Sequence, residues 1–254
     1  MLIDTHCHLD APEFDGNVPA VLDAARKAGV GGFVVPGVEA ANFDAVAKLS
    51  AAHADVWHAW GIHPLYVARA QREDLESLSG RLEKGGAVAI GEIGLDHYVK
   101  PVDMDLQHFY FVEQLKLARR FDLPVILHVR RAVDAVLKEL RRIEVPGGIA
   151  HAFNGSRQQA DIFLSMGFKL GFGGAATFSG SRRIRALAAE LPEEGIVLET
   201  DAPYIRPEWA QDRPNAPANL ARIAAVIASL RGVDVTTLYR QTAINARRAL
   251  PGVG

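Results

Sequence analysis

Short runs of apolar, β-branched residues alternate along the chain with longer segments of helical periodicity. Eight of these runs have the length and composition of strands, and they cover residues 2–6, 32–36, 56–63, 88–94, 124–128, 147–151, 168–174 and 195–201. Several are apolar at almost every position, which is typical of parallel strands that are covered on both faces. The pattern therefore predicts a buried parallel sheet.

The segments between the strands place apolar residues at i, i+3, i+4 and i+7, which is the spacing of one helix face. They include residues 18–29, 42–53, 104–121 and 157–167, and two more amphipathic stretches, 219–231 and 236–249, follow a proline-rich segment at 202–219. We expect that segment to be a long ordered loop. Eight repeats of strand and helix without a dividing linker predict one domain, a (β/α)8 TIM barrel over residues 1–254.

The main alternative is an open, doubly wound sheet that binds a dinucleotide. Such a sheet would carry a glycine-rich phosphate-binding turn after its first strand. The segment DTHCHLDAPEF (4–14) contains no glycine at all. The pattern therefore favours the barrel.

Composition narrows the class of protein. Of 254 residues, 49% are hydrophobic and 23% are charged, and no apolar run reaches the roughly 18 residues that a membrane span needs. The first residues do not resemble an export signal, so we expect a cytoplasmic location. Lys and Arg number 28 against 30 Asp and Glu. Because a protein that covers many phosphates of a duplex usually has a basic excess, any contact with nucleic acid is expected to be local.

Histidines and acids gather at the carboxyl ends of the predicted strands. In a barrel of this type those ends meet on one face, where active sites are built. The residues at these positions are Asp4, His6, His8, His63, Glu92, Asp96, His128, His151, Glu199 and Asp201.

His6 and His8 flank Cys7, the only cysteine of the chain. Since side chains alternate along a strand, the two histidines are expected on one side, and Cys7 is predicted to be a buried spacer. Neutral imidazole binds divalent transition metals, and a carboxylate such as that of Glu92 can bridge two cations. The full set exceeds what one catalytic zinc needs, which predicts a two-cation hydrolytic site made of His6, His8, Glu92, His128, His151 and Asp201.

Other polar and aromatic residues have two interpretations each. His63, in the motif GIHP, lies at the correct rim for a substrate-binding or supporting role. Arg130 could hold a phosphate or simply begin a solvated helix. Tyr204 could stack a base or pack, as could Tyr66, Phe153 and Trp209. A structural role is favoured for the histidines at 53, 58, 97 and 108.

The motifs IDTHCHLD, GIHP, GEIGLD, LPVILHVRR, HAFNGS and LETDAPY follow one another along the chain. In this order they resemble the TatD family of metal-dependent hydrolases, a branch of the amidohydrolase superfamily of TIM barrels. The resemblance runs from residue 2 to about residue 219. GFVVPGVEAANF (32–43) and GFGGAATFS (171–179) are similar to the YjjV-like subgroup of that family.

The resemblance implies two divalent metal ions (Zn, Mg or Mn) per chain. It implies that His6 and His8 bind the first ion and that Asp201 ligates it and handles the proton of the water. Glu92 would bridge to the second ion, which His128 and His151 hold. Family members are deoxyribonucleases, often 3′-to-5′ exonucleases on single-stranded ends, which implies DNA or a short oligonucleotide as substrate.

The chain departs from the family pattern at three places. Val129 replaces a common serine but should face away from the site, and RPNAP (213–217) replaces RNEP, which affects the loop that meets substrate. INARRAL (244–250) replaces the usual ending and is expected to change packing only.

From these observations we expect hydrolysis of phosphodiester bonds, with Asp201 and Glu92 as catalytic residues. The alternative is hydrolysis of a small amide, lactone or phosphoester, because the same kind of site can attack a carbonyl. The absence of the superfamily's bridging lysine, with Glu92 on the fourth strand and Pro124 opening the fifth, favours the phosphodiester. A metal-binding module without turnover is the weakest hypothesis. No signal for an obligate protein partner is evident.

Overall fold

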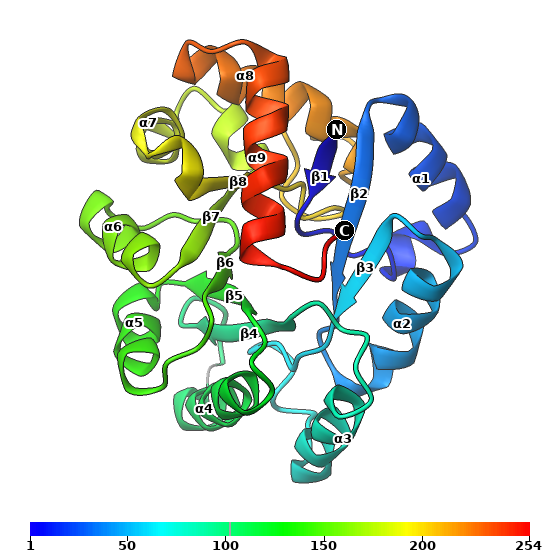
Figure 1. Ribbon diagram of the computed structural model, residues 1–254, viewed down its shortest axis with the longest axis vertical. Helices are drawn as coiled ribbons and strands as arrows, with labels where there is room; N and C mark the ends of the chain where they lie inside the picture. The colour runs from blue at the N-terminus through cyan, green and yellow to red at the C-terminus, as the bar shows by residue number, and fades with distance from the viewer. Residues whose placement is uncertain (102) are drawn as a thin grey trace.

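Eight parallel strands follow one another in chain order around the molecule, ringed by helices (Figure 1). The computed structural model describes residues 1–101 and 103–254. Three strands form one sheet in the order β1 (Leu2–Asp4), β2 (Val30–Pro36) and β3 (Val56–Ala59). The other sheet has the order β4 (Ile90–Asp96), β5 (Val125–Arg130), β6 (Gly148–Ala150), β7 (Phe168–Phe172) and β8 (Ile196–Leu198).

Backbone contacts join the two sheets at both seams. An isolated parallel bridge links Trp60 with Ile90 between β3 and β4. At the other seam, Thr5 N–H donates to the carbonyl of Leu198 at 3.0 Å. The predicted TIM barrel fold is confirmed.

The helices are α1 (Val18–Lys27), α2 (Phe43–Ala52), α3 (Arg72–Leu82), α4 (Met104–Phe121), α5 (Val133–Arg142), α6 (Arg157–Ser165), α7 (Arg182–Glu190), α8 (Leu220–Arg231) and α9 (Val235–Ala249). Each turns an apolar stripe to the barrel, as Val136, Leu137 and Leu140 of α5 illustrate. Helix α4 has the predicted bounds because Asp103 accepts a hydrogen bond from the Leu106 N–H at its start. None of the helices in the described ranges is long and apolar enough to cross a membrane.

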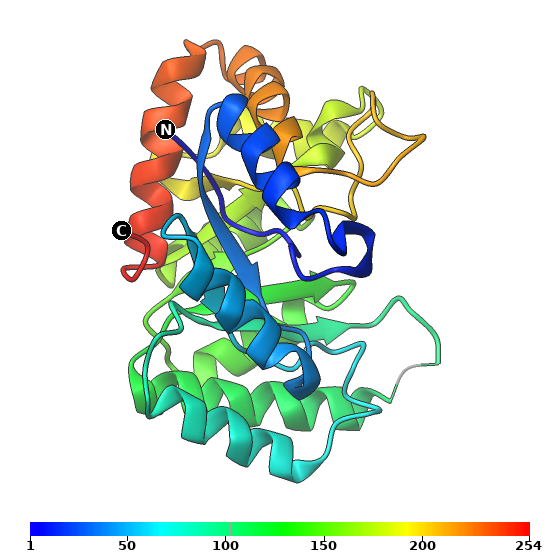
Figure 2. The same ribbon diagram turned by 90° about the vertical axis from the view of Figure 1, so that its right-hand side faces the viewer.

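Helix α9 closes the end of the barrel where the strands begin. A separate core cluster combines Ala243, Ala246 and Leu250 of this segment with barrel residues such as Ile126 and Val197. Figure 2 shows both chain termini on this side, whereas the loops after the strands lie on the opposite side. The only open end of the sheet is therefore the one that carries the predicted site.

Two strands are shorter than the hydropathy pattern predicts. The pattern extended β1 to residue 6 and β8 to residue 201, but the strands end at Asp4 and Leu198. Asp201 adopts a left-handed conformation with φ 52°, and its N–H donates to the carbonyl of His6 at 2.8 Å. The backbone leaves the sheet here because the two chain segments turn toward each other at the site.

The predicted loop at 202–219 is ordered by a buried asparagine. Asn215 is inaccessible to solvent, and its Nδ2 donates to the carbonyls of Thr200 (2.8 Å) and Ile205 (3.1 Å). This residue belongs to the RPNAP segment that departs from the family pattern. Asn215 therefore ties the loop to the end of β8, where Asp201 lies.

Candidate metal centre

The six predicted ligands come from five strand ends and converge on Glu92 of β4. Oε2 of Glu92 lies 3.1 Å from His6 Nε2. Its other oxygen, Oε1, lies 2.9 Å from His128 Nδ1 and 3.2 Å from His151 Nε2. A carboxylate with histidine nitrogens on both oxygens has the arrangement of a ligand that bridges two cations.

A second group of donors surrounds His6. Its Nε2 is 3.2 Å from Nε2 of His8 and 3.6 Å from Oδ1 of Asp201, and His8 Nε2 is 3.4 Å from the same oxygen. Donor atoms of His6, His8 and Asp201 all lie within 4.8 Å of one another, as do those of His6, Glu92 and His151. Both sets could hold a metal ion.

The donor chemistry fits divalent cations. Nitrogens of two neutral imidazoles 3.2 Å apart can share only one proton. Nδ1 of His6 is also buried without a hydrogen-bond partner. Nitrogen and carboxylate donors packed this closely suit Zn²⁺ or Mn²⁺, which would replace the missing protons as the positive partner.

The electrostatics keep the carboxylates ionised. Burial alone would raise the pKa of Glu92, but the nearby imidazoles of His6, His63 and His151 outweigh it and hold the pKa well below its ordinary value. Burial likewise opposes ionisation of Asp201, and the hydrogen bond with His8 lowers its pKa on balance. Burial lowers the pKa of His6. This favours the neutral imidazole that a metal requires.

Two acids that the sequence placed at strand ends, but not in the site, lie behind the histidines. Oδ2 of Asp96 is 3.0 Å from His128 Nε2, on the far side of the ring from Glu92. Asp96 Oδ1 accepts hydrogen bonds from the N–H groups of Tyr98 (2.8 Å) and Val99 (2.9 Å). Such a carboxylate orients a metal-binding histidine and selects its tautomer. The signal available in the sequence was the four-residue spacing from Glu92.

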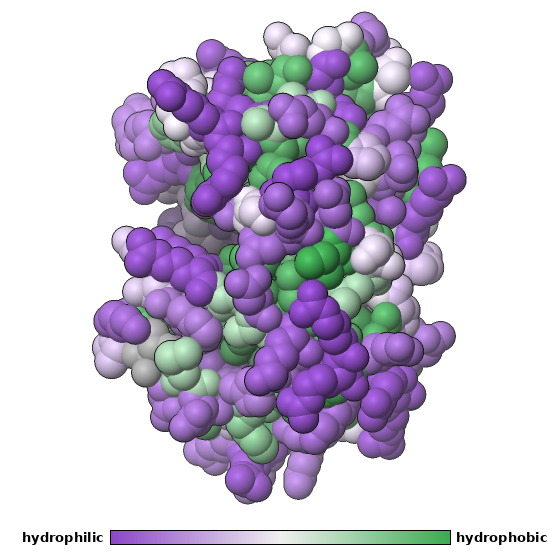
Figure 3. Space-filling view, turned by 90° about the vertical axis from the view of Figure 1, so that its left-hand side faces the viewer, coloured by the Kyte–Doolittle hydropathy of each residue, from purple (hydrophilic) through white to green (hydrophobic). Residues whose placement is uncertain are grey.

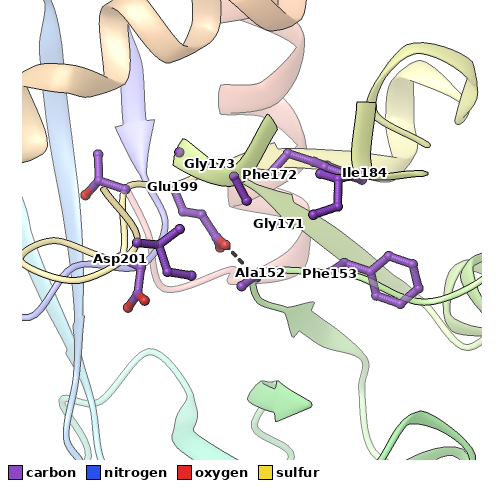
Figure 4. A pocket seen from close by; sticks show the side chains of 12 residues that line it. Ala152, Phe153, Gly171, Phe172, Gly173, Ile184, Glu199 and Asp201 are labelled. Atoms are coloured by element: carbon purple, nitrogen blue, oxygen red, sulfur yellow. Dashed lines mark hydrogen bonds between the residues drawn. The ribbon is translucent and has the colours of Figure 1, made fainter. Parts of the chain in front are cut away.

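Glu199 has the same position behind His151. Its Oε1 is 3.4 Å from His151 Nδ1 and accepts a hydrogen bond from the Ala152 N–H, as Figure 4 shows. Oε2 is buried without a partner, beside a cavity of about 20 Å³ between the ends of β6, β7 and β8. A Cβ atom at Gly171 would overlap Oε2. A glycine at this position therefore makes room for the carboxylate.

His63 lies against the same cluster but presents a different nitrogen chemistry. Its Nδ1 accepts a hydrogen bond from the Leu65 N–H at 3.1 Å, so the ring proton of the neutral form is on Nε2. Nε2 is 3.4 Å from Glu92 Oε1. Burial lowers the pKa of His63 to about 4, which keeps it neutral. The ring thus offers a donor to the site, in line with the predicted substrate-binding or supporting role.

The predicted rim residues divide into two groups. The Tyr204 ring lies 5.5 Å from that of His8 and 47% of the residue is exposed, while Arg130 is exposed with its guanidinium 4.0 Å above the Tyr98 ring. Both border the site. Phe153 is buried against Phe163, and the Trp209 indole donates to Asn219. These last two side chains serve packing.

Residues outside the site have structural surroundings. Cys7 is buried in the main core, so the alternation of His6, Cys7 and His8 is as expected. His108 pairs with Glu139 of α5 at 3.1 Å, and His58 is buried beside Trp60.

A barrel with buried histidines and carboxylates at the carboxyl ends of its strands defines the class of metal-dependent hydrolases. The chain belongs to the family of TatD-related DNases, whose model matches residues 3–251. It is 43% identical over 232 residues to the uncharacterized metal-dependent hydrolase YjjV of Escherichia coli K12, with 90% of each chain covered.

A second relative and a solved structure agree with this assignment. The protein of Pantoea ananatis named 3′-5′ ssDNA/RNA exonuclease TatD is 33% identical over 257 residues, covering 97% of this chain and 98% of that protein. The crystal structure of E. coli YjjV superposes with a TM-score of 0.95 at 39% identity and covers 98% of both chains. The expected family and fold are confirmed.

Proposed function

We propose that the protein hydrolyses phosphodiester bonds at the ends of single-stranded DNA, using two divalent cations. The observation that carries the proposal is the position of Glu92, whose two oxygens face separate groups of histidines at the open end of the barrel. The name of the Pantoea relative, a single-strand exonuclease, supports the choice of substrate.

Each ligand has a role in this proposal. His6, His8 and Asp201 hold one cation, His128 and His151 hold the other, and Glu92 contacts both. Bound cations supply Lewis acidity and a water of lowered pKa. The Asp201 carboxylate, kept ionised by its histidine neighbours, accepts the proton that the attacking water loses.

Three further residues position the substrate. The Nε2–H of His63 donates to a phosphate oxygen at the bottom of the site. The exposed Arg130 guanidinium binds a phosphate at the rim, since its planar fork matches phosphate geometry. Tyr204, half exposed beside His8, stacks against the terminal base.

The direct test compares cleavage and bound metal in Glu92→Gln and the native protein. Protein purified without chelators is incubated with end-labelled single-stranded DNA and Mg²⁺, Mn²⁺ or Zn²⁺. We expect stepwise shortening from the 3′ end by the native protein. In Glu92→Gln the rate should fall at least about 100-fold because both cations lose a shared ligand.

The matched control is Glu139→Gln, which alters a buried carboxylate of α5 outside the cluster. It should keep its metal and its activity. The nuclease proposal fails if no ion supports cleavage of DNA while a lactone or dipeptide is hydrolysed. Unchanged metal stoichiometry in Glu92→Gln would refute the bridging role.

A further inference from the structure

Charged side chains divide the mouth of the site into two unlike halves. The loops that follow β1 and β2 cover residues 5–17 and 37–42, and they contain Asp10, Glu13, Asp15 and Glu39 but no Lys or Arg. We call these four residues the acidic rim. The nearest cation from the next loop, Arg69, is already paired with Glu39 at 3.0 Å.

The acidic rim acts on side chains at the metal centre. Burial, then the negative charge of Glu13, raises the pKa of Tyr204 to about 12. Burial, then the charge of Glu39, likewise raises the pKa of Tyr66, which packs on His63 with ring centroids 5.9 Å apart. The negative potential of the acidic rim therefore reaches the half of the mouth beside His8 and His63.

The opposite half has the reverse composition. Between the strand ends and the following helices, residues 131–132, 151–156 and 173–181 contain no Asp or Glu. Four exposed arginines border them, and we call Arg130, Arg131, Arg182 and Arg183 the arginine rim. Figure 3 shows this side of the molecule, where hydrophilic surface borders a hollow at the edge that carries the mouth.

The arginines are held without being neutralised. The guanidinium groups of Arg130 and Arg131 lie 4.0 Å and 4.5 Å above the ring of Tyr98. Arg183 donates to Oδ1 of Asn154 at 2.7 Å, and Asn154 follows His151 by three residues. Because an aromatic face and an amide carry no net charge, the positive charge stays available to a ligand.

The position of two of these arginines is not explained by helix stability. Arg182 and Arg183 occupy the first two positions of α7, and no acid is present in its first turn. A cation there opposes the helix dipole, at a cost of about 0.3–1 kcal/mol each. An anionic ligand at the mouth would offset this cost.

We propose that the arginine rim is a phosphate track that guides single-stranded DNA away from the metal centre across the ends of β5 to β7. The inference rests on the proposed function and extends it. The acidic rim repels phosphates on the other side, so the strand has one exit and must end at the site. The division of charge thus favours release of terminal nucleotides over cutting within a strand.

The test measures how much the arginines matter as the substrate becomes longer. The variant Arg182→Gln/Arg183→Gln is compared with native protein on a dinucleotide and on a 12-nucleotide strand. We expect the ratio of kcat/KM for the long substrate to that for the short one to fall about tenfold. The slope of log(kcat/KM) against log(salt) for the long strand should become less negative by about 1, since each phosphate contact to a single strand contributes about 0.7.

The control variant is Arg247→Gln/Arg248→Gln, which removes two arginines near the end of α9, at the closed end of the barrel. It should leave both the ratio and the slope unchanged. The phosphate track is overturned if the Arg182/Arg183 variant loses the same factor on both substrates, or if the control variant loses as much. Native protein that cleaves the dinucleotide while the variant keeps the native ratio refutes only the track. Native protein that cleaves neither substrate overturns the proposed function as well.

Discussion

At the scale of single residues, the atom opposite the site decides what each histidine can do. His128 and His151 turn one nitrogen toward Glu92 and the other toward Asp96 and Glu199, respectively. Both rings are therefore oriented as metal ligands. In His63 the second nitrogen accepts a backbone N–H, which leaves a donor facing the site. Three histidines of the same type at three strand ends thus have two different chemistries.

The space for Glu199 gives a prediction at this scale. In Gly171→Ala the new methyl group would overlap Glu199 Oε2, so the carboxylate must move away from His151. We expect metal affinity to fall about 10- to 100-fold, the usual effect of losing an orienting partner. Competition with a chromogenic chelator measures the affinity. Native affinity in this variant, with Glu199 in its place, would show that His151 needs no such partner.

At the scale of elements, the sequence pattern predicted the helices more accurately than the strands. The periodic segment 104–121 coincides with α4 because a capping aspartate marks its first turn. The strand runs 56–63 and 195–201 overestimate β3 and β8, which end at Ala59 and Leu198. Apolar composition continues past the end of the ladder here, where the chain already bends to place His63 and Asp201.

Two glycines provide an element-scale prediction with opposite signs. Gly80 lies inside α3, and an added Cβ would meet nothing within 4 Å. Gly80→Ala should therefore raise the free energy of unfolding by about 0.5–1 kcal/mol, because alanine loses less entropy in a helix. At Gly61 the Cβ would come within 2.7 Å of the Gly91 backbone at the β3–β4 seam. Gly61→Ala should be destabilising in the same urea titration, and a stabilised variant would contradict the close approach.

At the scale of the whole molecule, stability depends on pH through histidines that fold into a neutral form. Burial lowers the pKa of His58 to about 4, and neither ring nitrogen has a hydrogen-bond partner. In the unfolded chain this group titrates near 6.5. Between these values the unfolded state binds more protons, so the stability from neutral His58 is complete above about pH 6.5 and is lost as the pH falls toward 4.

Replacing this side chain should reduce the pH dependence. We expect His58→Leu to lose about 2 kcal/mol less than the native protein between pH 7 and pH 4. Urea unfolding in the presence of a chelator measures the difference without a contribution from metal release. Equal losses in the two proteins would show that His58 takes up its proton as readily in the folded state as in the unfolded one.

The sequence by itself determined the order of strands and helices, the barrel and the set of residues at the strand ends. These follow from periodicities of two and 3.6 residues, which are local properties of the chain. It also separated His6 and His8 from Cys7, because alternation needs no knowledge of the rest of the fold.

Only the tertiary structure decided how those residues combine. The two-sided contacts of Glu92, the tautomer of His63 and the supporting positions of Asp96 and Glu199 depend on atoms from different strands. Asn215 ties the loop to β8, although the sequence could only place it in a proline-rich segment. The division of the mouth into the acidic rim and the arginine rim arises in the same way. Loops that are far apart along the chain become neighbours only when the strands form the barrel, and distances between side chains are set there.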